Sequence, residues 1–552
     1  MRSLAVTSFL FLLVITVMPV RAAGTDPAGL YEPSVFQLPA LRLEEQRVTA
    51  LLLAGQTDRA LEALSSLINR FPKLAELYFV RAVVYARTGR QDQALVELQE
   101  AVNAGFNNGG RLAAEPSFQA FRQSEAFSKL LKQANSNPPS RQTGEALEAT
   151  LVRDGVALVS ESNTSLEPLT NTLQSAFEFR SRLFSDPKVM TGKSPLADRL
   201  NDLYRQGKAA GNLGDLYDNR DRKHSIVSAS KFPQLAFIEY AAEAKAFDVD
   251  FSFNDRIFFN APTVGNASLG INGMWSVPRT TLTNPRMSAI AYLQYRSDHL
   301  YIYPSVRDYA WPEYGTDNFA VNTPYLIVSK GKSGSDRPFL EAAFIALAAL
   351  PPDVKKFARE NGLISPTVQM LLRRGQTGID SKDDYLSPKA HPVVFDGEKL
   401  DFGKIVDVAQ SLTVENLPPR VEFSVLRESA PQLAEGQGTT DTIFTTPAAA
   451  ARVVTKVGGS KSITVSMAPT EIRDGVSPAY HWRILEGDPS RITIEKQNET
   501  GSVAELTFKW QPTQVSLSNP EVRTDRADIG LFVEVDGMIS SPAIVSVYFK
   551  KN

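Results

Sequence analysis

The chain has 552 residues, a length typical of roughly three or four domains, and its 43% hydrophobic and 22% charged residues exclude global disorder. Lys and Arg number 59 against 61 Asp and Glu, so this near-neutral chain is not expected to bind nucleic acid or anionic lipid. It contains no cysteine, which excludes disulfides, thiolate metal sites and cysteine nucleophiles.

Residues 1–23 have the features of a signal peptide. Arg2 gives the positively charged n-region, residues 4–17 form the apolar h-region, and Val20-Arg21-Ala22 fits a cleavage site. The alternative is a membrane anchor, but the apolar run is shorter than the roughly 20 residues that a bilayer span requires. We expect an exported bacterial protein, periplasmic or extracellular, without a membrane span.

A repeat follows, in which residues 41–108 align with themselves at a shift of 34 positions. Gly55 then matches Gly89, Leu61 matches Leu95, and Ala60, Leu64 and Pro72 hold further repeat positions. This pattern resembles the tetratricopeptide repeat (TPR), a stacked pair of helices. The resemblance predicts helical repeats over 36–135.

The resemblance also implies a protein or peptide partner on the concave face of the array. Phe79, Val83 and Arg87 are the ligand-binding residues expected there. Alternatively, these side chains only pack against the next domain.

A polar linker over 134–145 leads to a predicted central domain of α+β (or α/β) type over 145–400. Hydrophobic periodicity predicts helices at 165–181 and 195–210. Runs rich in Ile, Phe, Tyr and Val predict strands at 235–240, 257–260, 289–295, 300–303 and 325–329. Capping signals predict further helices at 338–350, 352–361 and 365–374.

The densest polar segment of this domain is 215–225. Asp215, Asp218, Asp221 and His224 recur at every third position, followed by Ser225. Asp218, Asp221, His224 and Ser225 are candidate catalytic residues, with His224 as general base. Two alternatives stay open: a divalent cation on the carboxylates, and a structural network with neighbouring Arg and Lys. Because those cations compete for the carboxylates, we predict no metal here, and no cofactor elsewhere.

A second candidate segment follows the strand predicted at 325–329. Lys330, Lys332, Ser333 and Ser335 precede Asp336, where a helix is expected to begin. Two lysines at a helix start could bind a small anion. The alternative is a turn that ends in a helix cap, and the spacing does not fit a nucleotide-binding loop.

A third candidate is a cluster of aromatic and polar residues that could line a carbohydrate or peptide groove, or instead form core. Its members are Asp298, His299, Tyr301, Tyr303, Arg307, Asp308, Tyr309, Trp311, Tyr314 and Asp317. The segments 217–225, 322–329 and 334–340 resemble stretches of large exported bacterial proteins of unknown function.

For the last part of the chain, the sequence predicts a connector over 401–456, with a short helix at 448–451. A β-sandwich is predicted over 457–552. Short alternating strands are expected at 462–467, 479–485, 492–496, 504–510, 528–535 and 543–549. Tyr480-His-Trp482 is similar to the buried tryptophan strand of immunoglobulin-like and PKD-like domains, so Trp482 is expected in the core.

Three functions fit these predictions. The favoured one is an exported binding or scaffold protein that uses its TPR and sandwich modules. The alternative is a hydrolase that cleaves a cell-envelope or extracellular polymer through the central domain. A third is a receptor for a small anion or polysaccharide at 330–335.

Overall fold

The computed structural model describes residues 34–137, 149–167, 169–180, 194–221, 224–232, 234–251, 257–267, 278–305, 316–317, 319–468 and 470–550. The predicted signal peptide and most of the predicted linker lie outside these residues. The chain divides into two compact units. The first comprises Met1–Ala149, Val159–Ala176 and Ala241–Phe247, and the second comprises Thr150–Leu158, Phe177–Tyr240 and Asp248–Asn552.

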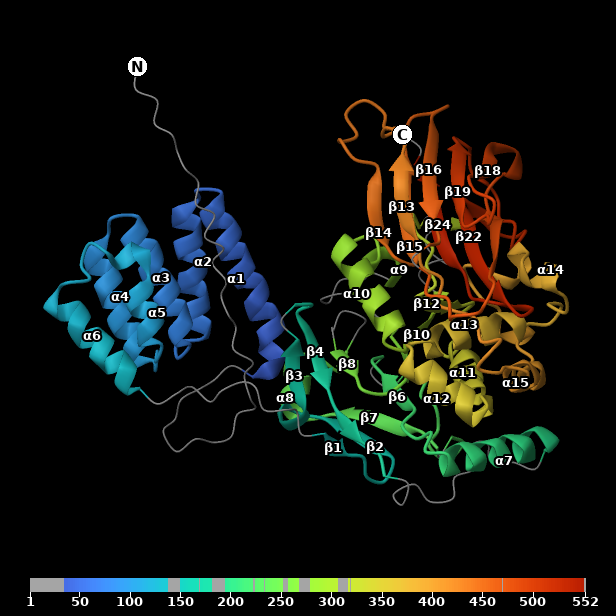
Figure 1. Ribbon diagram of the computed structural model, residues 1–552, viewed down its shortest axis with the longest axis horizontal. Helices are drawn as coiled ribbons and strands as arrows, with labels where there is room; N and C mark the ends of the chain where they lie inside the picture. Colours follow the sequence, from blue (N-terminus) through green and yellow to red (C-terminus); the bar gives the residue numbers. More distant parts are fainter. Residues whose placement is uncertain are drawn as a thin grey trace. The chain divides into compact units, whose positions relative to one another are not determined.

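The first unit is built from paired helices, as the repeat predicts (Figure 1, blue). Gly55 and Gly89, which lie 34 residues apart, end the first helix of each pair with φ of 71° and 78°, a conformation that favours glycine. The tetratricopeptide identity itself stays a prediction. The helices are α1 (Leu38–Leu53), α2 (Thr57–Arg70), α3 (Ala75–Arg87), α4 (Gln91–Asn103), α5 (Gly109–Ala114) and α6 (Glu125–Ser136).

A hairpin of β3 (Thr164–Glu167) and β4 (Thr172–Ser175) completes this unit together with α8 (Ala242–Lys245). The Asn171 side chain, at the hairpin turn, donates a hydrogen bond of 3.1 Å to the Pro39 carbonyl of α1. The helix predicted at 165–181 is therefore wrong. Thr164 and Leu166 of β3 are buried at alternate positions, which is the two-residue period of strands.

The second unit contains a parallel sheet of six strands. Their order is β12 (Leu326–Ser329), β10 (His299–Pro304), β9 (Thr263–Asn266), β6 (Leu216–Asn219), β7 (Ala236–Tyr240) and β2 (Val156–Val159). The pairs from β12 to β7 are all parallel. The chain adds β7 on one side of β6 and then β9, β10 and β12 on the other, which makes this an α/β fold of the doubly wound type.

The two faces of this sheet pack into different cores. Leu300 and Ile302 of β10 face a core made with helices, whereas Tyr301 and Tyr303 of the same strand face a core shared with the C-terminal strands. The helices of the first core include α7 (Pro195–Ala209), α11 (Arg337–Ala349), α12 (Pro352–Glu360), α13 (Ile364–Arg374) and α15 (Phe402–Gln410). The central region and the C-terminal sheets are thus parts of one unit.

The C-terminal part of the second unit has two sheets (Figure 1, orange to red). One is antiparallel and has the order β13 (Ser424–Glu428), β16 (Ser460–Ser466), β19 (Val503–Lys509), β18 (Ile492–Lys496). The other has the order β14 (Thr442–Thr446), β15 (Ala449–Val454), β24 (Ala543–Phe549), β22 (Arg526–Val535), β17 (Ala479–Glu486), with β23 (Met538–Ile539) beside β22. Trp482 is buried, as expected of a core residue.

Strands in this region begin earlier than predicted. The segment 401–456, expected to be a connector, supplies β13, β14 and β15 to the two sheets. The predicted helix at 448–451 is wrong, because this run of alanines is buried within β15 between β14 and β24. Strand pairing in a core overrides the helix propensity of alanine there.

The strand predicted at 289–295 is also wrong, since this segment lies in α10 (Pro285–Arg296). The Asn284 side chain caps the helix by accepting hydrogen bonds from the backbone N–H groups of Arg286 and Met287, and Pro285 occupies the first turn. α10 buries most of its circumference, so it lacks the polar stripe that reveals a surface helix in a sequence.

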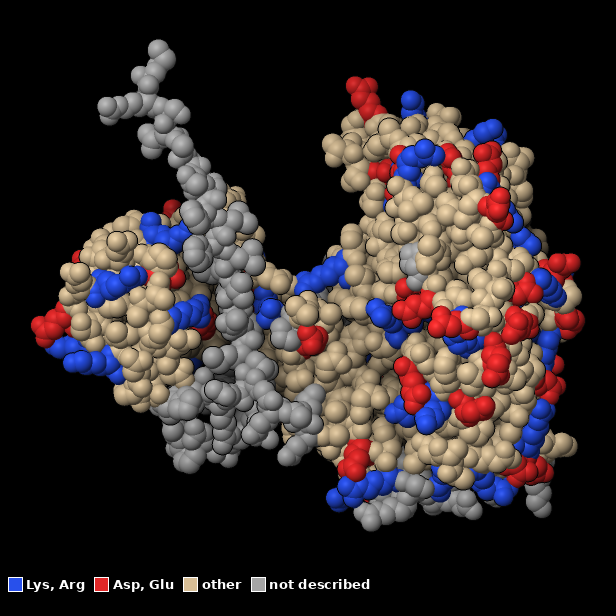
Figure 2. Space-filling view, in the orientation of Figure 1, with Lys and Arg blue, Asp and Glu red and all other residues tan. Residues whose placement is uncertain are grey.

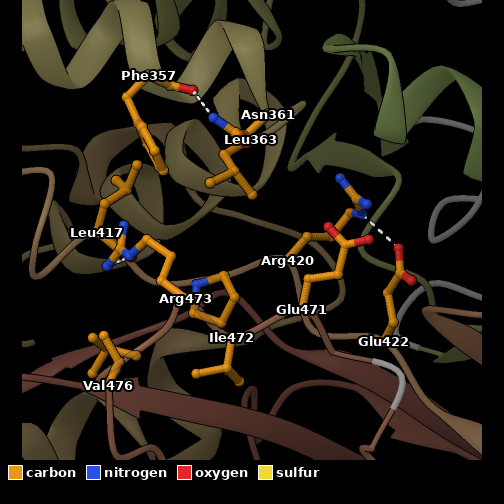
Figure 3. A pocket seen from close by; sticks show the side chains of 12 residues that line it. Phe357, Asn361, Leu363, Leu417, Arg420, Glu422, Glu471, Ile472, Arg473 and Val476 are labelled. Carbon is orange, nitrogen blue, oxygen red and sulfur yellow. Dashed lines mark hydrogen bonds and ion pairs between the residues drawn. The ribbon is translucent and has the colours of Figure 1, made fainter.

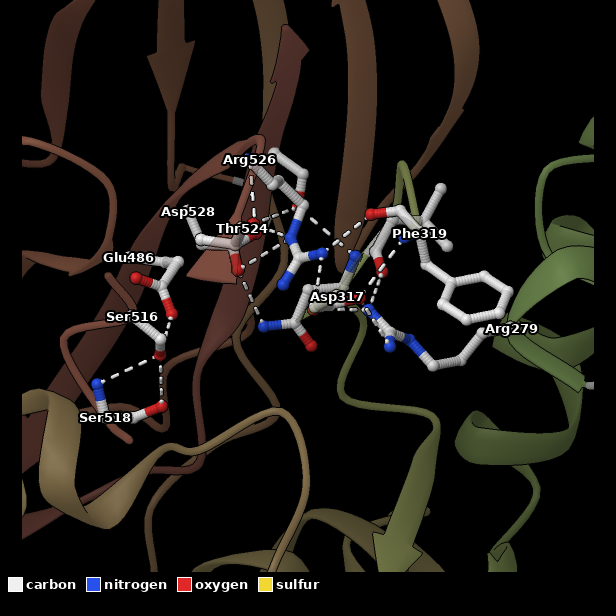
Figure 4. Close-up of polar contacts among 12 residues, drawn as sticks. Arg279, Asp317, Phe319, Glu486, Ser516, Ser518, Thr524, Arg526 and Asp528 are labelled. Carbon is white, nitrogen blue, oxygen red and sulfur yellow. Dashed lines mark hydrogen bonds and ion pairs between the residues drawn. The ribbon is translucent and has the colours of Figure 1, made fainter. Parts of the chain in front are cut away.

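A network of buried ion pairs joins the central region to the C-terminal sheets (Figure 4). Arg279, in α9 (Pro278–Thr281), binds both oxygens of Asp317 at 3.0 and 3.1 Å. Arg526 of β22 contacts Asp317 at 2.9 Å and Asp528 at 2.9 Å. Asp317 lies in β11 (Thr316–Asp317), which forms a small sheet with β21 (Arg523–Thr524) and β20 (Gln514–Val515).

The remaining short elements of the second unit are β1 (Thr150–Leu151), β5 (Phe177–Glu178), β8 (Ile257–Phe259) and α14 (Lys382–Tyr385). On the face drawn in Figure 2, the Lys and Arg side chains of this unit lie interspersed with Asp and Glu. Within the described part of the chain, none of the helices combines the length and apolar character of a membrane span.

Candidate functional site

The sequence-predicted segments meet at the carboxyl edge of the parallel sheet. Strands β6 and β9 are neighbours there, and the chain leaves β6 toward β7 on one side before it returns to β9 on the other. In sheets of this kind, ligands bind outside the carboxyl ends of the strands at the point where the strand order reverses. Arg220 and Asp221 follow directly after β6, and His224 and Ser225 come soon after, so topology places them at that point.

Asp218, the third residue of β6, is the centre of a buried network rather than an open catalytic group. Its carboxylate accepts hydrogen bonds from Arg220 Nε at 2.7 Å, Tyr240 Oη at 2.9 Å and Tyr301 Oη at 2.7 Å. Asp218 and Arg220 are both fully buried, and the Arg220 guanidinium lies 5.2 Å from the centre of the Tyr301 ring. For Asp218, the structure agrees with the structural network that the sequence left open.

The polar side chains beside this network fix the backbone of the loop. Asn219 and Asn266 each donate a hydrogen bond of 3.0 Å from the side-chain amide to the His224 carbonyl. The Tyr217 hydroxyl lies 3.0 Å from Asn266 Oδ1. Because the His224 carbonyl accepts hydrogen bonds from Asn219 of β6 and Asn266 of β9, both strands fix the position of the His224 backbone.

Asp221 and His224 form the pair with the chemistry of a general base. The Asp221 side chain is fully buried, whereas the His224 side chain is 61% exposed, and Asp221 Oδ1 lies 3.7 Å from His224 Nδ1. A backbone hydrogen bond of 2.9 Å from the His224 N–H to the Asp221 carbonyl holds the two residues in one turn. A buried carboxylate that faces one ring nitrogen leaves the other nitrogen for solvent or substrate.

Ser225 joins this loop to the second predicted segment. Its Oγ accepts a hydrogen bond of 2.9 Å from the Gly334 N–H, and its backbone has a positive φ of 52°. A non-glycine residue in that conformation is strained and is held by its surroundings. Burial raises the pKa of the neighbouring Asp336, the Asp221 charge raises it further, and the Ser225 side chain opposes the rise.

The loop at 330–335 is tied down by its neighbours. The Gly331 N–H donates to Ser305 Oγ at 3.1 Å, the Lys330 N–H donates to the Phe395 carbonyl at 2.7 Å, and Ser335 Oγ lies 2.9 Å from Ser329 Oγ. Lys330 also pairs with Asp396 at 3.5 Å, while Lys332 and Ser333 are exposed. Since the backbone N–H groups of Lys330 and Gly331 are already engaged, the loop resembles the predicted turn more than an open anion cradle. Asp336 makes no side-chain capping hydrogen bond to α11.

The aromatic cluster divides between core and undescribed residues. His299 is buried, with Nδ1 2.6 Å from the Ser297 carbonyl and Nε2 accepting from the Phe259 N–H at 3.0 Å. Burial lowers the pKa of His299 to about 4, so it is a neutral core residue. Tyr301 and Tyr303 are buried in β10, and Arg307, Asp308, Tyr309, Trp311 and Tyr314 lie outside the described residues.

The three residues predicted to bind a partner in the helical unit differ in exposure. Phe79 and Val83 are buried in the core of that unit, where Phe79 stacks on Phe106 at 4.7 Å between ring centres. Arg87, at the end of α3, is exposed. The two apolar side chains are therefore packing residues, and only Arg87 is available to a partner.

A cavity of about 230 Å³ lies elsewhere in the second unit, between α12, the segment 417–422 and the segment 471–476 (Figure 3). Phe357, Leu363, Leu417, Ile472 and Val476 supply apolar walls. Arg420 pairs with Glu422 at 2.7 Å beside them. No sequence-predicted site residue lines this cavity. Nor does any group of His, Asp or Glu side chains in the described ranges have the arrangement of a metal site.

No protein-family model and no curated protein matches this chain. Among solved structures, it is similar to one described as a nucleoside hydrolase-related hypothetical protein from Saccharophagus degradans that is associated with carbohydrate metabolism. The sequence identity is 10%, and the alignment covers 66% of this chain and 90% of that chain at a TM-score of 0.22. A likeness of that size has no weight for the chemistry, which rests on the contacts described above.

Proposed function

We propose that this chain is a hydrolase that cleaves an ester bond in a cell-envelope or extracellular polymer at the carboxyl edge of its parallel sheet. One observation supports this most strongly: the Asp221–His224 pair lies where the strand order reverses, on a loop that Ser225 ties to Gly334. Two segments more than a hundred residues apart in sequence thus build one polar edge.

The proposed step uses His224 as general base toward water. The exposed ring nitrogen takes a proton from a water molecule, whose oxygen attacks the electrophilic carbon of the substrate. Asp221 accepts a hydrogen bond from the other ring nitrogen and stabilises the imidazolium that forms. The imidazolium then gives its proton to the departing alcohol, so proton and electron pairs balance. A separation of 3.7 Å suits an unliganded site, where such pairs are often longer than in the complex.

Ser225 and Asp336 have positioning roles in this proposal. Ser225 is only 6% exposed and its Oγ accepts from the Gly334 N–H, so we assign it a positioning role and not that of the nucleophile. Asp336 directly precedes α11, and burial together with the Asp221 charge raises its pKa.

The test uses chromogenic nitrophenyl esters, together with the release of acid from purified, esterified envelope polysaccharide. If the wild-type chain turns over a probe, His224→Gln is expected to lower kcat/KM by about 100-fold or more. Ser225→Ala is expected to retain most of the activity. His481→Gln, which changes a histidine outside this edge, is the control. Wild-type inactivity on every probe, or full activity of His224→Gln, contradicts the proposal.

We propose as a second candidate that the chain is an exported binding or scaffold protein. The helical pairs of the first unit support a TPR-like interaction module, and the buried Trp482 in a sheet of the second unit supports an immunoglobulin-like or PKD-like module. Arg87→Glu in a pull-down tests the helical surface. Loss of partners with Arg87→Glu but not with His224→Gln favours this candidate over the hydrolase.

We propose export on the sequence alone. The residues 1–23 have the charge, apolar run and cleavage pattern of a signal peptide. N-terminal sequencing of the protein recovered from the periplasm or medium is expected to begin just after Ala22 or Ala23. An intact N-terminus on a cytoplasmic protein contradicts export.

A further inference from the structure

A small cavity lies on the flank of strand β12, apart from the proposed active edge. Its volume is about 20 Å³, which exceeds the roughly 10–15 Å³ that one water molecule needs. Its lining includes the two arginines Arg279 and Arg373, the polar residues Asn322 and Thr323, and the apolar residues Leu326 and Phe395. This is an unusual lining, because two arginines border one small space.

Arg373 has no counter-charge among the described residues. It is 4% exposed, lies at the end of α13, and forms no ion pair or side-chain hydrogen bond within the described ranges. Its Nε is fully buried without an acceptor. The guanidinium carbon lies 4.8 Å from the centre of the Phe395 ring, and Arg373 belongs to the last turn of its own helix. The ring offers no oxygen or nitrogen acceptor to a guanidinium, and within the described ranges no helix carbonyl accepts from Arg373 Nε.

The neighbouring charged groups do not supply the missing partner. Arg279 is itself saturated by both oxygens of Asp317, and the Asn322 amide donates to Asp528 at 3.0 Å. The groups that act electrostatically on Arg373 are the hydroxyls of Tyr385 and Tyr295, which are neutral at physiological pH. Burial lowers the pKa of Arg373 to about 10, as expected for a cation that lacks a partner.

Water in the cavity could accept hydrogen bonds from Arg373, but it cannot neutralise the charge. A buried charge that is neither paired nor solvated costs several kcal/mol. A compact anion satisfies the donors and the charge at the same time. We propose that this cavity binds a single small anion of about the size of chloride, with Arg373 as its charged partner.

The test measures the melting temperature of the full chain as gluconate is replaced by chloride at constant ionic strength. Gluconate is too large for the cavity. The wild-type melting temperature is expected to rise by about 2 °C or more and to saturate with chloride. Sulfate, which is larger and divalent, is expected to have no saturable effect beyond that of gluconate.

Arg373→Met gives the decisive comparison. This variant is expected to lose the chloride response, and in gluconate it should melt at or above the wild-type temperature, because it removes an uncompensated buried charge. Arg337→Met, which changes an exposed arginine of α11, should keep the response. Equal wild-type melting in chloride and gluconate, a retained response in Arg373→Met, or a loss in Arg337→Met overturns the proposal.

A diffraction experiment with bromide locates the anion directly. An anomalous peak beside the Arg373 guanidinium is expected in crystals of the wild type, and no such peak in Arg373→Met. Bromide peaks only on the molecular surface, or a cavity that holds water alone, contradict the proposal.

Discussion

Asp218 and Arg220 show how a buried pair of charges is kept stable in the central strand of the sheet. Three donors converge on the Asp218 carboxylate, from Arg220, Tyr240 and Tyr301. Burial raises the pKa of Tyr240 well above its usual value, so its hydroxyl stays a donor. The network thus fixes the beginning of the loop that carries His224.

Asp218→Asn is expected to destabilise the second unit by about 3 kcal/mol, because it removes the negative charge that the buried Arg220 faces. The measurement is the free energy of unfolding from a denaturant titration. Asp407→Asn is the control, since Asp407 is 68% exposed in its pair with Arg199 and should change stability by less than about 1 kcal/mol. Equal effects of the two substitutions contradict the account of the network.

Asp298 and His299 are adjacent residues whose pKa values shift in opposite directions. Burial raises the pKa of Asp298 to about 7 and lowers the pKa of His299 to about 4. Between pH 4 and 6.5, folding adds a proton to Asp298 and removes one from His299. As the pH rises, the Asp298 shift therefore lowers the free energy of unfolding and the His299 shift raises it. The two contributions nearly cancel.

Asp298→Asn is expected to remove this cancellation. Relative to the wild type, the pH dependence of the free energy of unfolding should become more positive by up to about 1.4 kcal/mol per pH unit between pH 4.5 and 6, because the Asp298 contribution that opposes His299 is gone. Asn tolerates the positive φ of 62° at this position, and its side-chain oxygen can still accept from the Ser365 N–H. The measurement is unfolding in denaturant at several pH values. A variant with the same slope as the wild type contradicts the opposed shifts.

At the scale of elements, β9 must lie very close to β6 and β10 for the edge to form. A side chain at Gly265 of β9 would collide with the Asp218 carbonyl and meet the Tyr301 ring at 2.6 Å. Glycine is required here for close approach rather than for a turn. The central strands thus leave no room for a larger residue.

Gly265→Ala is expected to destabilise the second unit by about 2 kcal/mol or more, because backbone and a buried ring would have to shift. Gly397→Ala is the matched control, since its new methyl would meet Phe339 and Pro338 at ordinary contact distances of 3.5 and 3.6 Å. Thermal unfolding checks both variants. If Gly265→Ala is as stable as Gly397→Ala, the packing of β9 differs from this description.

Helices and strands were predicted correctly where the sequence carries a capping residue or a clear hydrophobic period. Hydrophobic periodicity predicted α7, and Asp336 with Pro338 and the apolar run that follows predicted α11. Where an element is buried on all sides, as in α10 and β15, the period that distinguishes helix from strand is missing, and the prediction was wrong.

The candidate site was predictable only in part. The recurrence of Asp and His over 215–225 is visible in the sequence, but the burial of Asp218 and Asp221 is not. The contact of Ser225 with Gly334 is not visible, because it depends on the strand order of the sheet. The role of Asp218 in a core network was equally hidden, since its partners Tyr240 and Tyr301 belong to two other strands.

At the scale of the whole molecule, the central region and the C-terminal sheets share their cores. One core combines Tyr295 of α10 and Tyr301 of β10 with Trp482 and Phe508 of the C-terminal strands. The ion pairs of Arg526 with Asp317 and Asp528 add a second link (Figure 4). The sequence predicted two separate domains here.

We therefore expect the central region and the C-terminal sheets to unfold together. Hydrogen exchange in increasing denaturant should give β10 and β24 the same opening free energy. A chain that ends before residue 424 should fail to fold, because it exposes the tyrosine face of β10. A β24 that opens well before β10, or a stable truncated chain, contradicts this coupling.

The most direct test of the proposed function is a double-mutant cycle on Asp221 and His224. Asp221→Asn, His224→Gln and the double variant are compared with the wild type by kcat/KM on whichever probe the wild type hydrolyses, with thermal unfolding as the folding control. If the carboxylate acts through the imidazole, the double variant should be no slower than His224→Gln alone. Independent, multiplying losses, or full activity without His224, would contradict the account.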